Sequence, residues 1–398
     1  MKALNNSSGS LGIYVHVPFC RSKCQYCDFY SLAQGDVTKE LMDRYVTALT
    51  THIKESGARA PKYIVDSVYF GGGTPSYFGA ERLRTVFQAI SRYFNVSKTA
   101  EVTLEANPDT ITEKGMRRLV STGFNRISIG VQTNDDQTLK VLGRPHTYAQ
   151  AVKSVDIARN AGFDNISLDL MYGLPAQTPQ QWADALGSII DLKPDHISCY
   201  GLTLEPNTPL YQYRDYAALP NDDAQAAMYL YAVSTLEAYG YNQYEVSNFA
   251  KMDKECLHNI KYWTGGEYMS FGPSAASDFA GTRYTFTSNL HQYIRAIRTG
   301  DAITSECEYV PIKERAGEYL MLRMRTAFGI EKEEYESTFL MPFEPLEQIL
   351  TFYGTRGLTK KVKGHWQFTA QGYLVSNQII GQLIEAQSRS TPLSPHRF

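Results

Sequence analysis

Short apolar runs alternate with helical patterns along the first half of the chain. The apolar runs are rich in β-branched residues and predict strands at 12–17, 66–70, 101–106, 126–131, 165–173 and 196–202. Between them, apolar positions recur at helical spacing over 39–55, 81–93, 113–121, 135–142, 148–161 and 179–192. Strands and helices that alternate at these lengths form right-handed βαβ units with a parallel sheet. We therefore predict an α/β fold in which six units curve into a partial (β/α)6 barrel, open on one side, since an ordinary barrel needs eight.

The pattern changes after about residue 210. A helical stretch over 222–240 is followed by a strand-like run, "YNQYEVSNF", and by the segment 247–263, which is irregular and rich in aromatic residues. From about residue 306, an amphipathic helix, a second helix, the alternating "KVKGHWQFT" and a terminal helix indicate a small helical, winged-helix-like domain. We thus predict a disordered N-terminus (1–11), a core domain (12–240), a connecting segment (241–305) and a C-terminal domain (306–398).

The composition and charge of the chain limit the classes of protein to which it can belong. The 398 residues include 43% hydrophobic and 20% charged residues, which is typical of a globular chain. The formal net charge of −2 gives no electrostatic pull towards nucleic acid or an anionic membrane. The N-terminal "MKALNNSSGS" lacks the apolar core of a secretory signal, and no apolar run approaches membrane-spanning length. We expect a cytoplasmic protein whose thiols stay reduced.

Half of the six cysteines lie close together, directly after the first predicted strand. Their spacing is C-x3-C-x2-C, within the stretch "HVPFCRSKCQYCDFYS", whereas the remaining cysteines are scattered. In a reducing compartment such a group favours a metal site over a disulfide framework. The clustered residues are Cys20, Cys24 and Cys27, and the scattered ones are Cys199, Cys256 and Cys307.

Zinc and an iron–sulfur cluster are the two candidates for this site. A closed structural zinc site needs four ligands, and His16, the nearest fourth candidate, lies within the predicted strand. Three thiolates suit a [4Fe-4S] cluster, in which each binds one iron and the fourth iron stays open. That open iron can chelate S-adenosylmethionine, and one electron through the cluster then releases a 5′-deoxyadenosyl radical. The spacing favours the cluster over zinc.

These motifs carry a resemblance to a known family. The C-x3-C-x2-C motif after the first strand of a βα-repeat chain is similar to that of the radical SAM superfamily. The stretch "YVHVPFC" resembles, within it, the branch of oxygen-independent coproporphyrinogen III oxidase (HemN) and the HemW heme chaperones. The resemblance extends over nearly the whole chain and implies a [4Fe-4S] cluster and S-adenosylmethionine as cofactors.

Polar residues and glycines near the ends of successive predicted strands form the expected cofactor site, because ligands of such barrels bind at that end. The triple glycine in "GGGTP" would let the backbone approach a ligand, and the alternative is a plain βα turn. The resemblance implies that Gly72, Gly73 and Thr74 contact the methionyl amino group. It further implies cofactor contacts by Tyr14, Tyr26, Glu105, Gln132, Arg144 and Asp169, and by Gly201, where the local match is looser.

Two features decide between members of this branch. The oxidase carries a fourth cysteine two places after the last cluster cysteine, and this chain has Phe29 there. The stretch "HNIKYW" resembles the H-N-x-x-Y-W motif of the heme chaperones. It makes His258 a candidate axial ligand, with Tyr262 and Trp263 covering the macrocycle. The alternative is that His258 fixes the loop by hydrogen bonds while the aromatic residues pack as core. Cys256 is a rival ligand.

The resemblance therefore implies a heme chaperone of the HemW type, with heme as its cargo. Its expected partners are heme-accepting proteins and an electron donor, and no nucleic acid; whether the chain forms a homodimer stays open. The alternatives are the oxidase itself, which decarboxylates propionates of coproporphyrinogen, and another radical SAM tetrapyrrole enzyme. We expect no coproporphyrinogen oxidase activity, assign no catalytic residue, and leave open whether the chain is an enzyme.

Overall fold

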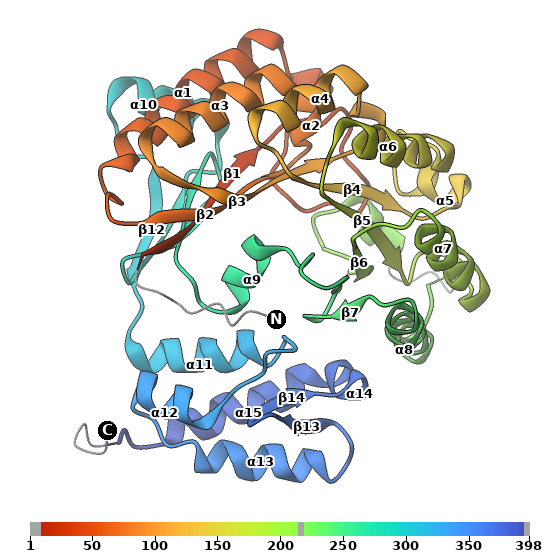
Figure 1. The fold of residues 1–398 in the computed structure, drawn as a ribbon, viewed down its shortest axis with the longest axis vertical. Coiled ribbons are helices and arrows are strands. Elements are labelled where there is room, and N and C mark those ends of the chain that lie inside the picture. Colours follow the sequence, from red (N-terminus) through yellow and green to blue (C-terminus); the bar gives the residue numbers. More distant parts are fainter. Residues whose placement is uncertain (1–8, 214–218, 394–398) are drawn as a thin grey trace.

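A curved sheet forms the centre of the molecule (Figure 1). The computed structural model describes residues 9–213 and 219–393. The first six strands along the chain run parallel, and each pairs with the next in sequence order. The six predicted strands and their parallel order are thus confirmed. They are β1 (Ser10–Val17), β2 (Ile64–Gly72), β3 (Asn95–Ala106), β4 (Arg126–Gln132), β5 (Asn165–Tyr172) and β6 (His196–Gly201).

One layer of helices covers the outer face of these strands, as Figure 1 shows. Most of these helices begin at a Thr or Asp whose side chain accepts a hydrogen bond from the backbone N–H three residues later, which caps the helix. All six predicted helices are present, and the short α2 (Pro75–Phe78) was not predicted. The six are α1 (Lys39–Gly57), α3 (Ala80–Tyr93), α4 (Glu113–Thr122), α5 (Asp136–Val141), α6 (Tyr148–Ala161) and α7 (Pro179–Asp191).

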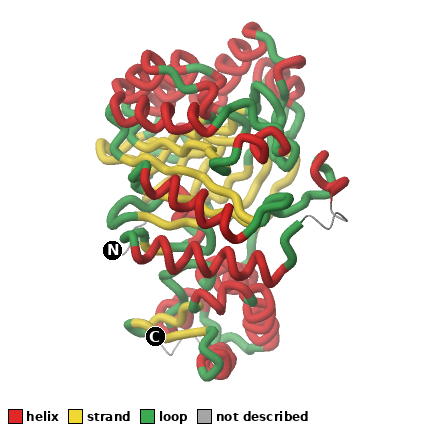
Figure 2. Tube along the Cα trace, turned by 90° about the vertical axis from the view of Figure 1, so that its right-hand side faces the viewer, coloured by secondary structure: helices red, strands yellow, loops and turns green. Residues whose placement is uncertain are grey.

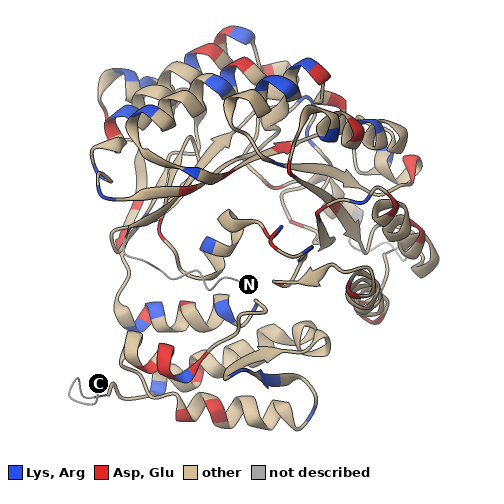
Figure 3. Cartoon of the chain, viewed as in Figure 1, with Lys and Arg blue, Asp and Glu red and all other residues tan. Residues whose placement is uncertain are grey.

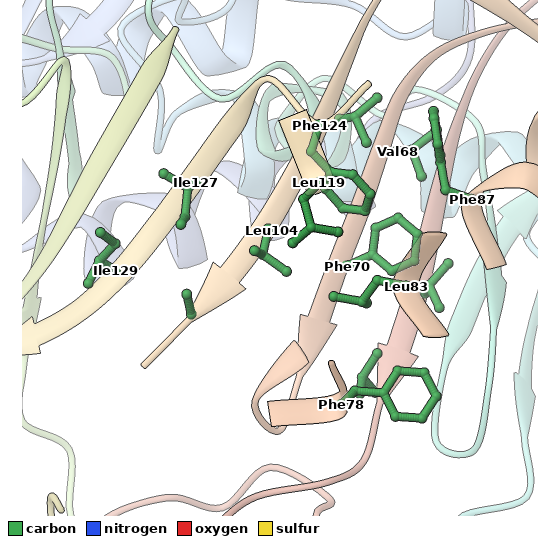
Figure 4. Packing of buried hydrophobic residues seen from close by; sticks show 14 of the residues in the cluster. Val68, Phe70, Phe78, Leu83, Phe87, Leu104, Leu119, Phe124, Ile127 and Ile129 are labelled. Carbon is green, nitrogen blue, oxygen red and sulfur yellow. The ribbon is translucent and has the colours of Figure 1, made fainter. Parts of the chain in front are cut away.

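The main hydrophobic core lies between this helical layer and the sheet (Figure 4). Apolar side chains of β2, β3 and β4 pack there against α3 and α4, and each buried side chain contributes about 1.5–3 kcal/mol. Because strand residues alternate between the two faces, their sequence neighbours point to the inner, concave face of the sheet. The residues in Figure 4 include Val68, Phe70, Leu83, Phe87, Leu104, Leu119, Ile127 and Ile129.

The predicted connecting segment, 241–305, contributes strands that extend the same sheet on both sides. On one side β8 pairs antiparallel with β6, and on the other β9 pairs parallel with β1. In the described residues the sheet therefore has twelve strands, in the order β12-β11-β10-β9-β1-β2-β3-β4-β5-β6-β8-β7. The added strands are β7 (Asn242–Gln243), β8 (Asn248–Ala250), β9 (Tyr268–Phe271), β10 (Ala276–Phe279), β11 (Thr282–Phe286) and β12 (Thr304–Tyr309).

Three helices lie between β6 and the second domain. One of them was predicted, one was not, and one lies in a segment that the sequence analysis expected to be irregular. The predicted helix after residue 222 is confirmed as α8 (Asp222–Ala238). The segment expected to be irregular contains α9 (Leu257–Trp263), and α10 (Leu290–Thr299) follows later. Two predicted domain boundaries differ from the ends of the strands: β1 begins at Ser10, and β12 ends at Tyr309. The rest of the predicted N-terminal tail, residues 1–8, lies outside the described residues.

A second, mostly helical domain follows β12 and lies at the far end of the molecule from the helical layer (Figure 2). Its helices pack around a hydrophobic core of their own, and a two-stranded hairpin completes the predicted winged-helix-like arrangement. Arg315 pairs with Asp278, and Arg283 with Glu318, which ties α11 to the sheet. The elements are α11 (Ile312–Arg323), α12 (Lys332–Phe339), α13 (Glu344–Gly354), β13 (Thr359–Val362), β14 (His365–Phe368), α14 (Ala370–Leu374) and α15 (Ser376–Arg389).

Charged residues lie mainly on the helices of both domains, and the central strands carry few (Figure 3). Within the described residues, no helix combines the length and the apolar character that crossing a bilayer requires.

Candidate functional site

The cysteine loop and the carboxyl ends of the central strands meet at one cavity of about 390 Å³. Most of the residues that the sequence singled out line this cavity, although they come from segments far apart along the chain. They are Cys20, Cys24, Tyr26, Cys27, Gly72, Gly73, Thr74, Glu105, Gln132, Arg144 and Asp169. Tyr14, Gly201 and His258 are not among its lining residues.

The cysteine loop follows β1 and presents free thiols to the cavity. Cys20 and Cys24 are buried and Cys27 is partly exposed. Burial raises the pKa of Cys20 and of Cys27, whereas hydrogen bonds to the sulfurs favour the thiolate. The hydroxyl of Thr74 lies 3.5 Å from Cys20 Sγ, and Arg144 Nη1 donates to Cys24 Sγ at 3.4 Å.

The three thiols of the cysteine loop line one cavity and can supply ligands to an iron–sulfur cluster. Within the described residues, no three His, Cys, Asp or Glu side chains are arranged to hold one metal ion. A tetrahedral zinc site would need its ligands to converge on one point at about 2.0–2.3 Å. A [4Fe-4S] cluster instead takes one iron per thiolate and so spreads its ligands. The three thiols of the cavity could each bind one iron of such a cluster, and the hydrogen bonds to two of the sulfurs would tune it.

The triple glycine brings the end of β2 against the cysteine loop. A Cβ on Gly73 would lie 2.9 Å from backbone atoms of Phe19 and Val17, and one on Gly72 would lie 2.6 Å from the His16 ring. The N–H of Gly73 donates to the Val17 carbonyl at 2.9 Å. Gly72 also has a φ of 114°, which favours glycine. The glycines thus serve protein packing as well as ligand access, which the sequence did not reveal.

Arg144 crosses the cavity and is held by several acceptors. Its Nη2 donates to Asn107 Oδ1 at 2.9 Å and to the Gly130 carbonyl. A Cβ at residue 130 would lie 2.6 Å from Nη2, so any larger residue there would require the guanidinium to shift. The Arg144 Nε is buried and has no hydrogen-bond partner among the described residues. One buried donor therefore remains for a bound ligand.

Two carboxyl groups line the cavity, Glu105 from β3 and Asp169 from β5, and β4 lies between these strands. Glu105 accepts hydrogen bonds from the Tyr69 hydroxyl at 2.7 Å and from the Gly72 N–H at 3.2 Å. Burial raises its pKa to about 7, and the negative charge of Asp169 acts in the same direction. Burial also raises the pKa of Asp169, which accepts from the hydroxyls of Ser198 at 2.8 Å and Ser128 at 3.0 Å. Both groups would be stabilised as carboxylates by a cationic ligand.

Gln132 lines the cavity in a conformation that non-glycine residues rarely adopt. Its φ is 71°, at the end of β4, and the pairing register with β5 shifts between Gly130 and Gln132. Such a backbone costs of order 1–3 kcal/mol and is found mainly at functional sites. The residue with this backbone conformation is therefore one that lines the cavity.

The sequence analysis missed several residues that line the cavity, although the sequence contains a pattern that indicates them. A serine, a methionine and a tyrosine occupy the inner face of β4, β5 and β6, at alternate positions with the apolar residues of the outer face. A polar stripe of period two along otherwise buried strands would have identified them. They include Ser128, Met171 and Tyr200, and Asn107 follows the end of β3.

Tyr14 and Gly201 lie beside the cavity. The Tyr14 ring stacks at 6.2 Å from that of Tyr69, the residue that holds Glu105, and its hydroxyl lies 3.2 Å from His16 Nδ1. Gly201 ends β6, where a Cβ would lie 3.1 Å from the ring of Tyr172. Their predicted direct contacts with the cofactor remain predictions.

The motif "HNIKYW" forms α9 and closes the inner face of the sheet on the side away from the cysteines. Glu101 caps this helix and accepts from the N–H groups of Leu257 at 3.0 Å and His258 at 3.1 Å. The His258 ring is fully buried, with Nδ1 3.0 Å from the Ser67 hydroxyl and Nε2 2.8 Å from the Tyr262 hydroxyl. Burial lowers its pKa to about 3. With both ring nitrogens occupied, this arrangement matches the structural alternative; axial ligation by His258 would require α9 to rearrange.

The other candidate heme ligands named by the sequence are also enclosed. Cys256 is fully buried and its thiol lies 3.6 Å from Glu101 Oε1. His146 and His196 are buried as well.

Comparisons with known proteins show which family the chain is similar to. The Radical SAM superfamily matches residues 14–189. The heme chaperone HemW of Bacillus subtilis (strain 168) is 32% identical over 375 residues, which cover 93% of this chain and 98% of that protein. The heme chaperone HemW of Haemophilus influenzae is 34% identical over 380 residues, 93% of this chain and 97% of that protein.

A mouse protein and a solved structure are also similar to this chain. Radical S-adenosyl methionine domain-containing protein 1, mitochondrial, of Mus musculus is 32% identical over 93% of this chain and 83% of that protein. The structure of coproporphyrinogen III oxidase (HemN) from Escherichia coli, a radical SAM enzyme, matches with a TM-score of 0.81. It covers 96% of this chain and 90% of that chain at 22% identity, which establishes the fold.

Proposed function

The chain belongs to the HemW heme chaperone family of the radical SAM superfamily, and we propose that it binds heme and passes it intact to acceptor proteins. The observation that carries this proposal is its similarity to heme chaperones, at 32–34% identity, over nearly the whole length of both chains. An electron donor and heme-accepting proteins are its partners on this proposal, and the reducing cytoplasm is its place of action.

On this proposal the cavity at the strand ends holds a [4Fe-4S] cluster and S-adenosylmethionine. Cys20, Cys24 and Cys27 would bind the cluster. When bound, these groups supply one-electron chemistry that no side chain can provide. Thr74 and Arg144 donate hydrogen bonds to two of the sulfurs and so favour the thiolates.

The remaining residues of the cavity bind and orient S-adenosylmethionine. This molecule carries a sulfonium and an ammonium charge, and the carboxylates of Glu105 and Asp169 offer the complementary charge. The buried Arg144 Nε–H has no hydrogen-bond partner among the described residues, and it would donate to the methionyl carboxylate. The strained backbone of Gln132 would place its side-chain amide in the same cavity.

One residue of the cysteine loop argues against coproporphyrinogen oxidase activity as the function. Phe29 occupies the place of the extra cysteine, lines the cavity and is 70% exposed, so a phenyl ring rather than a thiol stands at its mouth. A phenylalanine can neither bind a metal nor transfer a proton. The chain therefore lacks one group that the oxidase motif contains, whereas all the residues expected of a cluster site are present.

Anaerobic incubation of the cluster-loaded protein with heme, or separately with coproporphyrinogen, tests the proposal. We expect stoichiometric binding of heme, recovered unchanged by mass spectrometry, and no decarboxylated product. Repeated turnover of coproporphyrinogen would instead establish the oxidase, and an opened or methylated macrocycle would establish a heme-modifying enzyme.

A further inference from the structure

The histidine of the motif "HNIKYW" packs against a tyrosine that holds a carboxyl group of the cofactor cavity. The helix α9 lies on the concave side of the sheet (Figure 1), and the ring of His258 stacks on that of Tyr69, with 5.3 Å between the centroids and 25° between the planes. The Tyr69 hydroxyl donates to Glu105 Oε1 at 2.7 Å. Glu105 lines the cavity, whereas Tyr69 and His258 are not among its lining residues. The motif is thus linked to the cofactor site through one intervening side chain.

Both oxygens of the Glu105 carboxyl are held by groups of β2. Tyr69 donates to Oε1 at 2.7 Å, and the N–H of Gly72 donates to Oε2 at 3.2 Å. The bond from Tyr69 is the shorter of the two, and short hydrogen bonds to an ionised carboxylate are strong. The position of the Tyr69 ring therefore decides where the carboxylate lies.

Glycines at two positions make room for these contacts. A Cβ on Gly71 would lie 2.9 Å from Tyr69 Cε1 and 3.1 Å from Glu105 Oε2. A Cβ on Gly12 would lie 3.2 Å from His258 Cε1. Any larger residue at these positions would push the rings or the carboxyl away, because the interior is close-packed. The first glycine of "GGGTP", to which the sequence analysis gave no contact, thus allows Tyr69 and Glu105 to meet.

The helix α9 is fastened to the same strand that carries Tyr69. The Ser67 hydroxyl lies 3.0 Å from His258 Nδ1, and Lys261 Nζ, one turn later, lies 3.1 Å from Asp66 Oδ1. Ser67, Asp66 and Tyr69 all belong to β2. The imidazole is therefore held in one orientation against the tyrosine ring.

A third ring packs against the pair. The Tyr14 ring lies 6.2 Å from that of Tyr69 and 6.4 Å from that of His258, with angles of 22° and 27° between the planes. Three rings in nearly parallel planes restrict one another, since a turn of one would collide with its neighbours. Tyr69 is thus confined by neighbouring rings and by its hydrogen bond to Glu105.

We propose that His258 and Tyr69 are positioning residues of the S-adenosylmethionine site: the ring of His258 holds Tyr69, and the hydroxyl of Tyr69 holds the Glu105 carboxylate for the cationic ligand. The inference rests on the proposed function, since it takes the cavity to be the S-adenosylmethionine site. Neither side chain has to touch the ligand, because a carboxylate that is already in place binds a cation without the cost of being ordered. The motif "HNIKYW" thereby acts on cofactor binding, and this role needs no bond to iron.

Equilibrium binding of S-adenosylmethionine to the cluster-loaded full chain at pH 8 tests the assignment. Tyr69→Phe keeps the ring but loses the hydrogen bond, and it should weaken binding roughly three- to tenfold. His258→Ala removes the ring that supports Tyr69 and should weaken binding by a similar factor. Gly71→Ala keeps all three side chains but separates Tyr69 from Glu105, so it should weaken binding as well. The iron and sulfide content of all three variants should equal that of the wild type.

The same substitutions in a Glu105→Gln background separate positioning from a general disturbance of the fold. The glutamine carries no charge, so nothing remains there for Tyr69 to hold towards a cation. Tyr69→Phe and His258→Ala should therefore cause little further loss of affinity in this background. A disturbance of the whole cavity would instead weaken binding equally in both backgrounds.

Two buried residues elsewhere serve as matched controls. His196 has its ring nitrogens 2.8 Å from the hydroxyls of Ser167 and Tyr244, and its ring lies against Tyr244. His196→Ala should lose stability as His258→Ala does, but it should bind S-adenosylmethionine as the wild type does. Tyr241→Phe removes a hydroxyl that donates to the Pro194 carbonyl at 2.8 Å, and its affinity should also be unchanged.

The outcomes distinguish this inference from the proposed function. If the wild type binds no S-adenosylmethionine, the proposed cofactor site fails and this inference with it. If the wild type binds it and both Tyr69→Phe and His258→Ala bind equally well, the inference alone is overturned. Losses that persist in full in the Glu105→Gln background, or an equal loss in His196→Ala, would overturn it too.

Discussion

Glu105→Gln should weaken S-adenosylmethionine binding and remove most of its pH dependence. Because burial raises the pKa of Glu105 to about 7, the carboxyl is roughly 90% ionised at pH 8 and roughly 10% ionised at pH 6. If the cationic cofactor binds the carboxylate, the affinity of the wild type should fall about ninefold between these two pH values. The glutamine keeps the shape of the side chain but carries no charge, so its affinity should be low and nearly constant.

The same pKa shift predicts an opposite effect on stability. The folded-state pKa lies above the ordinary value of 4.5, so ionisation of Glu105 costs the folded state free energy. That cost appears as the pH rises from about 4.5 to 7, and it amounts to at most about 3 kcal/mol above that range. In the absence of cofactor, Glu105→Gln should therefore be more stable than the wild type at pH 8 and equally stable at pH 4.5, which separates lost binding from misfolding.

Equilibrium binding of S-adenosylmethionine to the cluster-loaded protein at pH 6 and pH 8 is the assay. Glu245→Gln is the matched control, because burial also raises the pKa of Glu245 to about 7 but this residue does not line the cavity. Its pH profile for binding should be that of the wild type. An affinity of the wild type that is equal at both pH values, or a Glu105→Gln variant with the wild-type profile, would refute the reasoning.

Three further outcomes are expected. Replacing Cys20, Cys24 and Cys27 with Ala should abolish the iron, sulfide and brown colour of reconstituted protein; stoichiometric zinc without sulfide in the wild type would contradict the cluster. Phe29→Cys, which restores the oxidase-type spacing, should by itself yield no protoporphyrinogen from coproporphyrinogen in an anaerobic assay, because it leaves the rest of the cavity unchanged; repeated turnover would show that this position alone sets the activity. His258→Ala leaves buried hydroxyl groups without a partner, at about 1–3 kcal/mol each, so urea unfolding should show a loss of stability while the heme spectrum stays unchanged; a shifted Soret band would return ligation to His258.

The parallel part of the fold could be predicted because long, regular elements carry strong patterns. The β-branched runs and the capped amphipathic helices gave all six βα units, with most boundaries within a few residues. The strand-like run 241–249 contains β7 and the start of β8. The strands from β9 to β12 were missed because they have four to six residues, and β12 is exposed along its whole length, so its sequence shows no alternation. The helix α9 was missed because its N-terminal cap is Glu101, distant in sequence.

The site was predictable where chemistry depends on residue type and spacing. The cysteine triad and the polar strand ends converge on one cavity, as parallel strands that share an edge require. Contacts between distant segments were not predictable. The packing of Gly73 against Phe19, the room that Gly130 leaves for Arg144 and the positive φ of Gln132 depend on tertiary structure alone. The burial of His258 belongs to the same class, because the motif itself does not reveal that Ser67 occupies one of its ring nitrogens.

The central claim is that the chain carries heme and returns it intact. The direct measurement is to load the cluster-reconstituted protein with heme under anaerobic conditions, add S-adenosylmethionine and a reductant, and then transfer the cargo to excess apomyoglobin. The account predicts one heme bound per chain and quantitative appearance of myoglobin whose heme has an unchanged mass. A chain that binds no heme, or that releases an altered tetrapyrrole, would contradict it.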